Sequence, residues 1–231
     1  MVDVHVADVL ACSIERWYPR LKGCALRARY TALAPSIVAY LHADGVVLPA
    51  DGGDGDEDDE ATVMLARDEE YQRLRAWMLA TIDEYGGAVM PKLNWSAPKD
   101  AVWVATGSTL KCQTTDDVWL LLKSSDHIAY DLSYPFATCA DAGSAAASAA
   151  AATMGYQLVL KEWFDIPASA EFRCFVKHNT LVGVSQRDHS NFYEFLAAQQ
   201  EEILQRIVRF FVANLHGKPL QLTNCTSYQK R

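Results

Sequence analysis

Apolar side chains recur at helical spacing in several segments of the chain. They fall every three or four positions in 14–21, 69–85 and 194–215, and this spacing predicts three amphipathic helices. Gly86-Gly87 follows the second of these segments and should end that helix. Thr114, with two aspartates shortly after it, is typical of the residue that precedes the first turn of another helix.

Shorter apolar runs predict strands at five places along the chain. These runs are 88–93, 101–105, 157–164, 171–177 and 180–186. His178-Asn179 is a plausible tight turn that would join the last two runs into a hairpin. The alanine- and serine-rich segment 141–156 offers no face large enough to pack, so we expect a surface loop there. The residues after Pro219 are polar and show no pattern.

Most of the net charge of −8 comes from one acidic segment. Residues 51–60 hold seven carboxylates and no base, so the rest of the chain is nearly neutral. Like-charge repulsion predicts a disordered insertion at about residues 50–62. The alternating acids Asp54, Asp56 and Asp58 also suggest a calcium loop, but the flanking helices and the following glycine are missing. The excess of acids argues against a general nucleic-acid binder.

The six cysteines are scattered, and the chain has no C-x-x-C pair. A structural zinc site or a disulfide framework therefore has little support. The first residues carry acids where a secretory signal needs bases. The longest uncharged stretch, 142–160, is too weakly apolar for a membrane span. We expect a reduced, soluble, cytoplasmic monomer that binds neither membranes nor nucleic acid.

Two segments carry polar side chains at the predicted end of a strand. Lys92 ends the run 88–93, where its ammonium group could reach a phosphate together with Asn94, although an exposed loop lysine is the alternative. The run 157–164 turns polar at Lys161-Glu162, where backbone groups could bind an adenine edge. A buried strand with two exposed charges would explain the same letters.

The predicted hairpin 171–186 carries arginines, which are costly on a core-facing side of a strand. With a two-residue turn, Glu171, Arg173 and Gln186 share one face, and Arg187 points away unless the strand is bulged or ending. These side chains would bind an anion or form an internal salt bridge, either Glu171–Arg173 or Arg187–Asp188, and the pattern leaves both outcomes open. No P-loop, Rossmann or hydrolase-elbow motif occurs in the chain.

Six blocks of sequence, taken together, resemble the cell division cycle protein 123 family of eukaryotes over about residues 8–219. The blocks are Arg16–Pro19, Pro91–Pro98, Leu122–Asp126, Leu158–Leu160 with Trp163, Ala170–Lys177 and Gly183–Asp188. The resemblance implies an α+β, ATP-grasp-like fold of two lobes, with an antiparallel sheet and flanking helices. It also implies a non-catalytic assembly chaperone that binds ATP and the gamma subunit of eukaryotic translation initiation factor 2.

The resemblance further assigns residues to the nucleotide. Lys92, Asn94 and Ala97 would contact it from the first loop. Lys161, Glu162 and Trp163 would form the adenine hinge. Glu171, Arg173 and Arg187 would surround the ribose and the phosphates.

The chain departs from the family at its C-terminal part, where the family has strands whose acids hold Mg²⁺. After Asp188 the only carboxylate side chains are three glutamates in the predicted helix, so the Mg²⁺ ligands are absent. We therefore expect one incomplete family domain, truncated at its C-terminus and lacking the last strands. Its N-terminal lobe would be 1–140, and its ATP-grasp lobe 157–231. An ATP-grasp ligase that joins a carboxylate to an amine is the alternative function, as is a truncated product defective in Mg²⁺-ATP binding.

Overall fold

The computed structural model describes residues 3–49 and 67–217, and the backbone of 225–228. The predicted acidic insertion therefore lies outside the described residues. The chain divides into two compact units, each made of two stretches of sequence. Unit 1 contains Met1–Val9 and Arg27–Trp163, and unit 2 contains Leu10–Leu26 and Phe164–Arg231. The chain thus leaves unit 1 after its first residues and returns at Arg27.

Unit 1 is built on a three-stranded antiparallel sheet with the order β1-β3-β2. The strands are β1 (Ala28–Ala32), β3 (Gln157–Glu162) and β2 (Val89–Lys92). β3 pairs with β1 on one side and with β2 on the other. Because of this central position β3 belongs to unit 1, whereas the sequence had suggested that a second lobe begins at residue 157.

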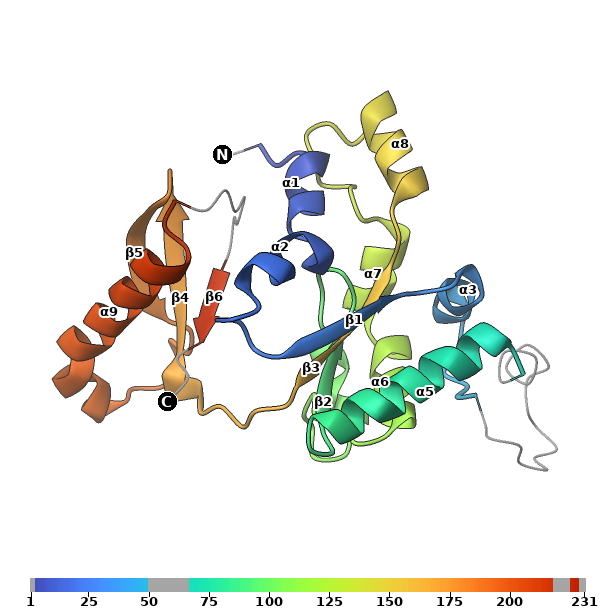
Figure 1. Ribbon diagram of the computed structural model, residues 1–231, viewed down its shortest axis with the longest axis horizontal. Helices are drawn as coiled ribbons and strands as arrows, with labels where there is room; N and C mark the ends of the chain where they lie inside the picture. The colour runs from blue at the N-terminus through green and yellow to red at the C-terminus, as the bar shows by residue number, and fades with distance from the viewer. Residues whose placement is uncertain (1–2, 50–66, 218–224, 229–231) are drawn as a thin grey trace. The chain divides into compact units, whose positions relative to one another are not determined.

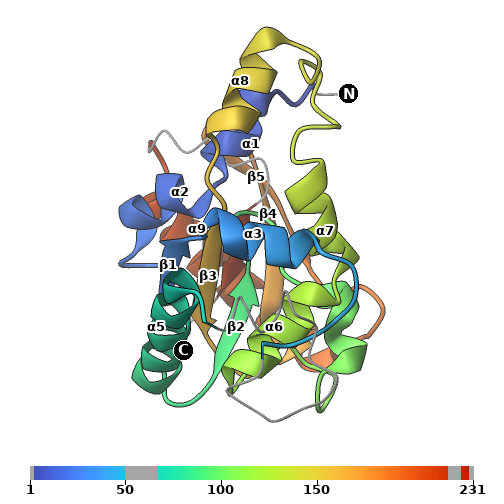
Figure 2. The ribbon, with the colours of Figure 1, turned by 90° about the vertical axis from the view of Figure 1, so that its right-hand side faces the viewer.

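Unit 1 also contains several helices (Figures 1 and 2). Most residues of its hydrophobic core lie on these helices. They are α3 (Pro35–His42), α5 (Glu69–Glu84), α6 (Thr115–Lys123), α7 (Asp126–Ser133) and α8 (Ala145–Thr153), with a 3₁₀ segment η1 (Lys99–Val104) and, crossing from unit 1 into unit 2, α1 (Val6–Ala11). The predicted start of α6 is confirmed, since Thr114 and Asp117 form a reciprocal capping box. The predicted helix 69–85 is confirmed as α5.

The core of unit 1 includes Trp119 of α6, whose side chain is completely buried. Its ring lies edge-on to Tyr40 at 5.7 Å and stacks with Tyr71 at 6.0 Å between centroids. Leu158 and Leu160 of β3 belong to the same buried cluster. One face of the sheet therefore packs against helices, and the alternate residues of β3 lie on the other face.

Unit 2 has a second three-stranded antiparallel sheet, in the order β5-β4-β6, together with helices α2 and α9. Its elements are α2 (Ile14–Leu21), η2 (Ala168–Ala170), β4 (Glu171–Lys177), β5 (Thr180–Gln186), α9 (Glu194–Asn214) and β6 (Cys225–Tyr228). The predicted hairpin is confirmed: His178 and Asn179, both at positive φ, connect β4 and β5. Ile207 and Phe211 of α9 are buried, and α9 lies beside β5 (Figure 1).

Three expectations about individual segments are wrong. Residues 101–105 form no strand but lie in η1 and just after it, because the chain turns after Pro98 and has no strand partner there. Segment 141–156 contains helix α8, which Ser144 caps at the Ala147 N–H; alanine's helix propensity decides where packing does not. The unpatterned C-terminal residues contribute β6, which pairs with β4 through backbone groups and needs no side-chain pattern.

The mixture of helices and antiparallel sheets agrees with the α+β class expected from the sequence. Among the described residues, the model contains no helix that is both long and apolar enough to cross a bilayer.

Candidate functional site

The end of β2 and the end of β3 bring two lysines to one face of the unit 1 sheet. Met90 pairs with Lys161 and Lys92 pairs with Val159. Because side chains alternate along a strand, Lys92 and Lys161 lie on the face opposite Leu158 and Leu160. Both lysines are half-buried. Two partly desolvated ammonium groups on one sheet face can attract an anion such as a phosphate.

The Lys161 ammonium lies in a strongly desolvated position. Burial lowers the pKa of Lys161, and the positive charge of Lys99 acts in the same direction. Lys99 follows the loop 93–98, so this loop and the end of β3 lie close enough to interact. Of the predicted site residues in unit 1, Lys92 and Lys161 therefore share one electropositive region.

Asn94 is buried, so its side chain is not open to a ligand. Its side chain is only 1% exposed. Its Nδ2 donates to the Gly155 carbonyl at 3.0 Å, and its Oδ1 accepts from the Gln157 N–H at 2.6 Å. The amide thus ties the loop after β2 to the start of β3, and its role in the structure is to position that loop.

A buried carboxylate braces the same loop and escaped the sequence analysis. Asp131 of α7 accepts a hydrogen bond from the Ser96 N–H at 2.8 Å. Burial raises the pKa of Asp131, although the Ser96 hydrogen bonds and the charge of Lys92 act in the other direction. No local pattern could have identified Asp131, because it lies 35 positions from Ser96 in the chain. Ala97, also predicted to contact the nucleotide, is half-buried in this braced loop.

The predicted adenine hinge at the end of β3 is already occupied in part by the chain itself. The Glu162 N–H donates to the Arg27 carbonyl at 3.0 Å, and the Trp163 N–H donates to the Ala88 carbonyl at 3.2 Å. The Glu162 carboxylate forms a bidentate pair with Arg27, at 2.7 and 2.5 Å. An adenine at this strand end would therefore have to use carbonyl groups or a later N–H.

In unit 2 a β-bulge decides which side chains share a face of the hairpin. The register shifts between Phe175 and Val176, so that Phe175 pairs with Gly183 and Val182 is the extra residue. Phe172 consequently pairs with Gln186, and the Arg187 N–H donates to the Glu171 carbonyl at 2.9 Å. The expected position of Gln186 beside Glu171 is wrong, and Arg187 takes that place.

The bulge gives Glu171 and Arg187 an ion pair, one of the two outcomes that the sequence left open, though with a different partner. Their side chains are 16% and 35% exposed. Arg173 lies on the same face, opposite Ser185, and is exposed. Unit 2 thus presents one paired and one accessible guanidinium on a single sheet face, an arrangement suited to binding a phosphate.

Among the described residues, no three His, Cys, Asp or Glu side chains form a group that could hold a metal ion. The described residues therefore provide no cluster of ligands for a protein-held Mg²⁺.

Comparison with known proteins shows which protein family the chain is similar to. The family model described as D123 matches residues 17–226. The "Translation initiation factor eIF2 assembly protein" of Xenopus tropicalis is 38% identical over 221 residues, which make up 88% of this chain and 64% of that protein. "Cell division cycle protein 123" of Aspergillus terreus is 38% identical over 219 residues, 90% of this chain and 52% of that protein.

A solved structure agrees with this placement. The structure of Cdc123 from Schizosaccharomyces pombe matches with a TM-score of 0.74 at 33% identity, over 95% of this chain and 79% of that one. The chain spans between about half and two thirds of the length of the curated relatives given above. The resemblance seen in the sequence blocks is confirmed, and the chain belongs to the D123 family.

Proposed function

We propose that this chain is an ATP-binding assembly chaperone for eukaryotic translation initiation factor 2. It binds the gamma subunit and promotes assembly of the heterotrimeric factor in the cytoplasm, and thereby supports translation initiation and cell-cycle progression. The observation that carries the proposal is family membership across residues 17–226, with relatives whose names state assembly of this factor. The role is non-catalytic, and the fold is proposed to be ATP-grasp-like.

Binding to the immobilised gamma subunit tests the partner directly. We expect the purified chain to be retained, and we expect it to increase the amount of alpha subunit that joins gamma. The Xenopus tropicalis relative serves as the positive control, because its printed name states the assembly function. Retention of that relative without retention of this chain, at equal concentration, would contradict the proposal.

Each unit by itself offers cationic side chains among the residues proposed to contact the nucleotide. Lys92 and Lys161 share one face of the first sheet, and Arg173 is exposed on the second. Each is suited to a charge-assisted hydrogen bond with a phosphate oxygen. Because the described residues provide no metal-ligand group, ATP is proposed to bind weakly and with little dependence on Mg²⁺.

Calorimetric titration with ATP, in the presence and absence of Mg²⁺, tests this part. Lys92→Ala and Arg173→Ala should each weaken binding about tenfold or more, the usual effect of losing one charge-assisted contact. Lys111→Ala, an exposed lysine elsewhere in unit 1, is the matched control and should bind as the unaltered chain does. Tight binding that requires Mg²⁺ would refute the proposed mode, and ADP release dependent on an added amine would favour the ligase instead.

A further inference from the structure

The apolar surface of α9 continues from its buried side onto a solvent-exposed flank. The inner side is marked by the buried Ile207 and Phe211. The outer stripe consists of Ala197, Leu204, Val208 and Val212, spaced so that all four lie along one side of the helix. Leu204, Val208 and Val212 are 39%, 40% and 58% exposed. Such a stripe is more than isolated exposed residues, which need no explanation.

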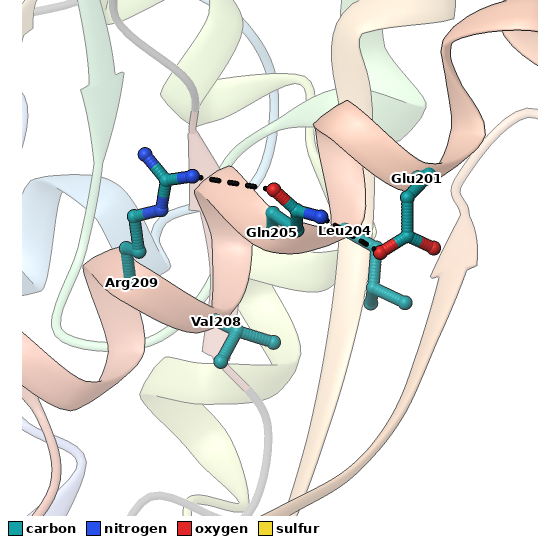
Figure 3. A pocket seen from close by; sticks show the side chains of 5 residues that line it. All are labelled: Glu201, Leu204, Gln205, Val208 and Arg209. Atoms are coloured by element: carbon teal, nitrogen blue, oxygen red, sulfur yellow. Dashed lines mark hydrogen bonds between the residues drawn. The ribbon is translucent and has the colours of Figure 1, made fainter.

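A row of polar side chains runs beside the stripe, and together they line a shallow groove (Figure 3). Gln205 Nε2 donates to Glu201 Oε1 at 2.9 Å, and Arg209 Nη2 donates to Gln205 Oε1 at 3.2 Å. Glu201 and Arg209 each lie four residues from Gln205, in opposite directions. The row therefore has a negative end, a neutral centre and a positive end.

This arrangement is complementary to itself when the helix is reversed. A two-fold axis level with Gln205 and perpendicular to the helix places Glu201 of one copy opposite Arg209 of the other, twice. The same operation keeps both polar rows on one side of the apolar seam. Within the seam, Leu204 lies close to its own symmetry mate, and Val212 lies within one residue of the level of Ala197 of the second copy.

We propose that α9 pairs two copies of this chain in an antiparallel helix–helix contact along the stripe Ala197–Val212. The sequence alone had suggested a monomer. One helix pair buries less than the roughly 1,200–2,000 Å² typical of stable interfaces, so the dimer is weak and forms as concentration rises. The occupant is a second copy because the charge order of the groove matches its own reverse.

Sedimentation equilibrium of the full chain, with charge-reversal variants, tests the pairing. Glu201→Arg and Arg209→Glu should each raise the dimer dissociation constant about tenfold, since either change turns two attractive contacts into repulsive ones. The double variant Glu201→Arg/Arg209→Glu should restore the original constant. Val208→Glu should abolish the dimer, and circular dichroism melting shows whether each variant is folded.

The control pair is Glu202→Arg and Arg206→Glu, which changes the same kinds of charge at residues that do not line the groove. These controls should leave the dissociation constant unchanged. A chain that stays monomeric at its highest soluble concentration overturns the proposal. So does a dimer that the controls weaken as much as the test variants, or one that the double reversal fails to restore.

Discussion

Asn94 shows how a single residue in a candidate site can serve the fold rather than a ligand. Its amide satisfies two backbone groups of a neighbouring segment while almost no part of it reaches solvent. Lys92, two positions earlier, keeps part of its surface accessible. Two residues that lie close together in one motif can therefore have different roles.

Replacing Asn94 with alanine should destabilise the protein even without nucleotide. The Gly155 carbonyl and the Gln157 N–H would each lose a part-buried hydrogen bond, at about 1–3 kcal/mol each, so the free energy of unfolding should fall by about 2–6 kcal/mol. Urea denaturation measures this change, with the exposed Gln113→Ala as control. Unchanged stability combined with lost ATP binding would show that Asn94 is a nucleotide contact instead.

Asp188 organises the turn between β5 and α9. It accepts hydrogen bonds from the N–H groups of Ser190 and Asn191, from Asn191 Nδ2 and from the Tyr193 hydroxyl. These donors, first of all Tyr193 and the Asn191 side chain, lower the pKa of Asp188 to about 2. The turn is therefore held by the ionised carboxylate.

The pH dependence of stability should reveal this turn. Since the folded-state pKa is lower than the unfolded value of about 4, the contribution of Asp188 is present above pH ~4 and disappears as pH falls toward 2. Asp188→Asn should therefore be less stable than the unaltered chain at neutral pH, and the difference should shrink in acid. A difference that is constant from pH 7 to pH 2, measured by denaturant titration, would contradict the assignment.

At the scale of elements, the bulge in the β4–β5 hairpin determines which side chains meet. If Val182 paired with Phe175 in a regular ladder, a two-residue turn would place Gln186 opposite Glu171 and direct Arg187 to the other face. Because Val182 is bulged out instead, Arg187 pairs with Glu171 beside Arg173. The bulge at Val182 thus sets the charged face of unit 2.

Deleting Val182 should remove the bulge but keep Glu171 opposite Arg187, because Gly183 still pairs with Phe175 in a regular ladder. Inserting one alanine between Val184 and Ser185 should instead bring Gln186 opposite Glu171 and turn Arg187 to the other face. A double-mutant cycle with Glu171→Gln and Arg187→Gln should give a coupling energy of about 1 kcal/mol in the unaltered chain and in the deletion variant, and close to zero after the insertion. Full coupling in the insertion variant, or its loss in the deletion variant, would mean that the strand register does not set this ion pair.

At the scale of the whole molecule, each unit is made of two separate stretches of the chain, so that Leu10–Leu26 groups with the C-terminal part. β3, far along the chain, lies between β1 and β2. The positively charged residues predicted to bind one nucleotide are consequently distributed over both units. The chain belongs to the D123 family, and relatives longer than this chain are named for assembly of translation initiation factor eIF2.

The amino-acid sequence by itself determined the helices with clear periodicity, the hairpin with its turn, and the family. Local spacing and capping depend on neighbouring residues, so α5, α6, β4 and β5 could be predicted. The short segments η1 and β6 could not, because their conformation depends on whether a partner strand is present. Helix α8 was missed because its lack of a packing face was given more weight than alanine's helix propensity and the Ser144 cap. Only the tertiary structure decided that Asn94 is enclosed, that Asp131 braces the loop, and that Arg187 reaches Glu171. Those outcomes depend on contacts between residues far apart in the chain and on one bulge, which no local pattern specifies.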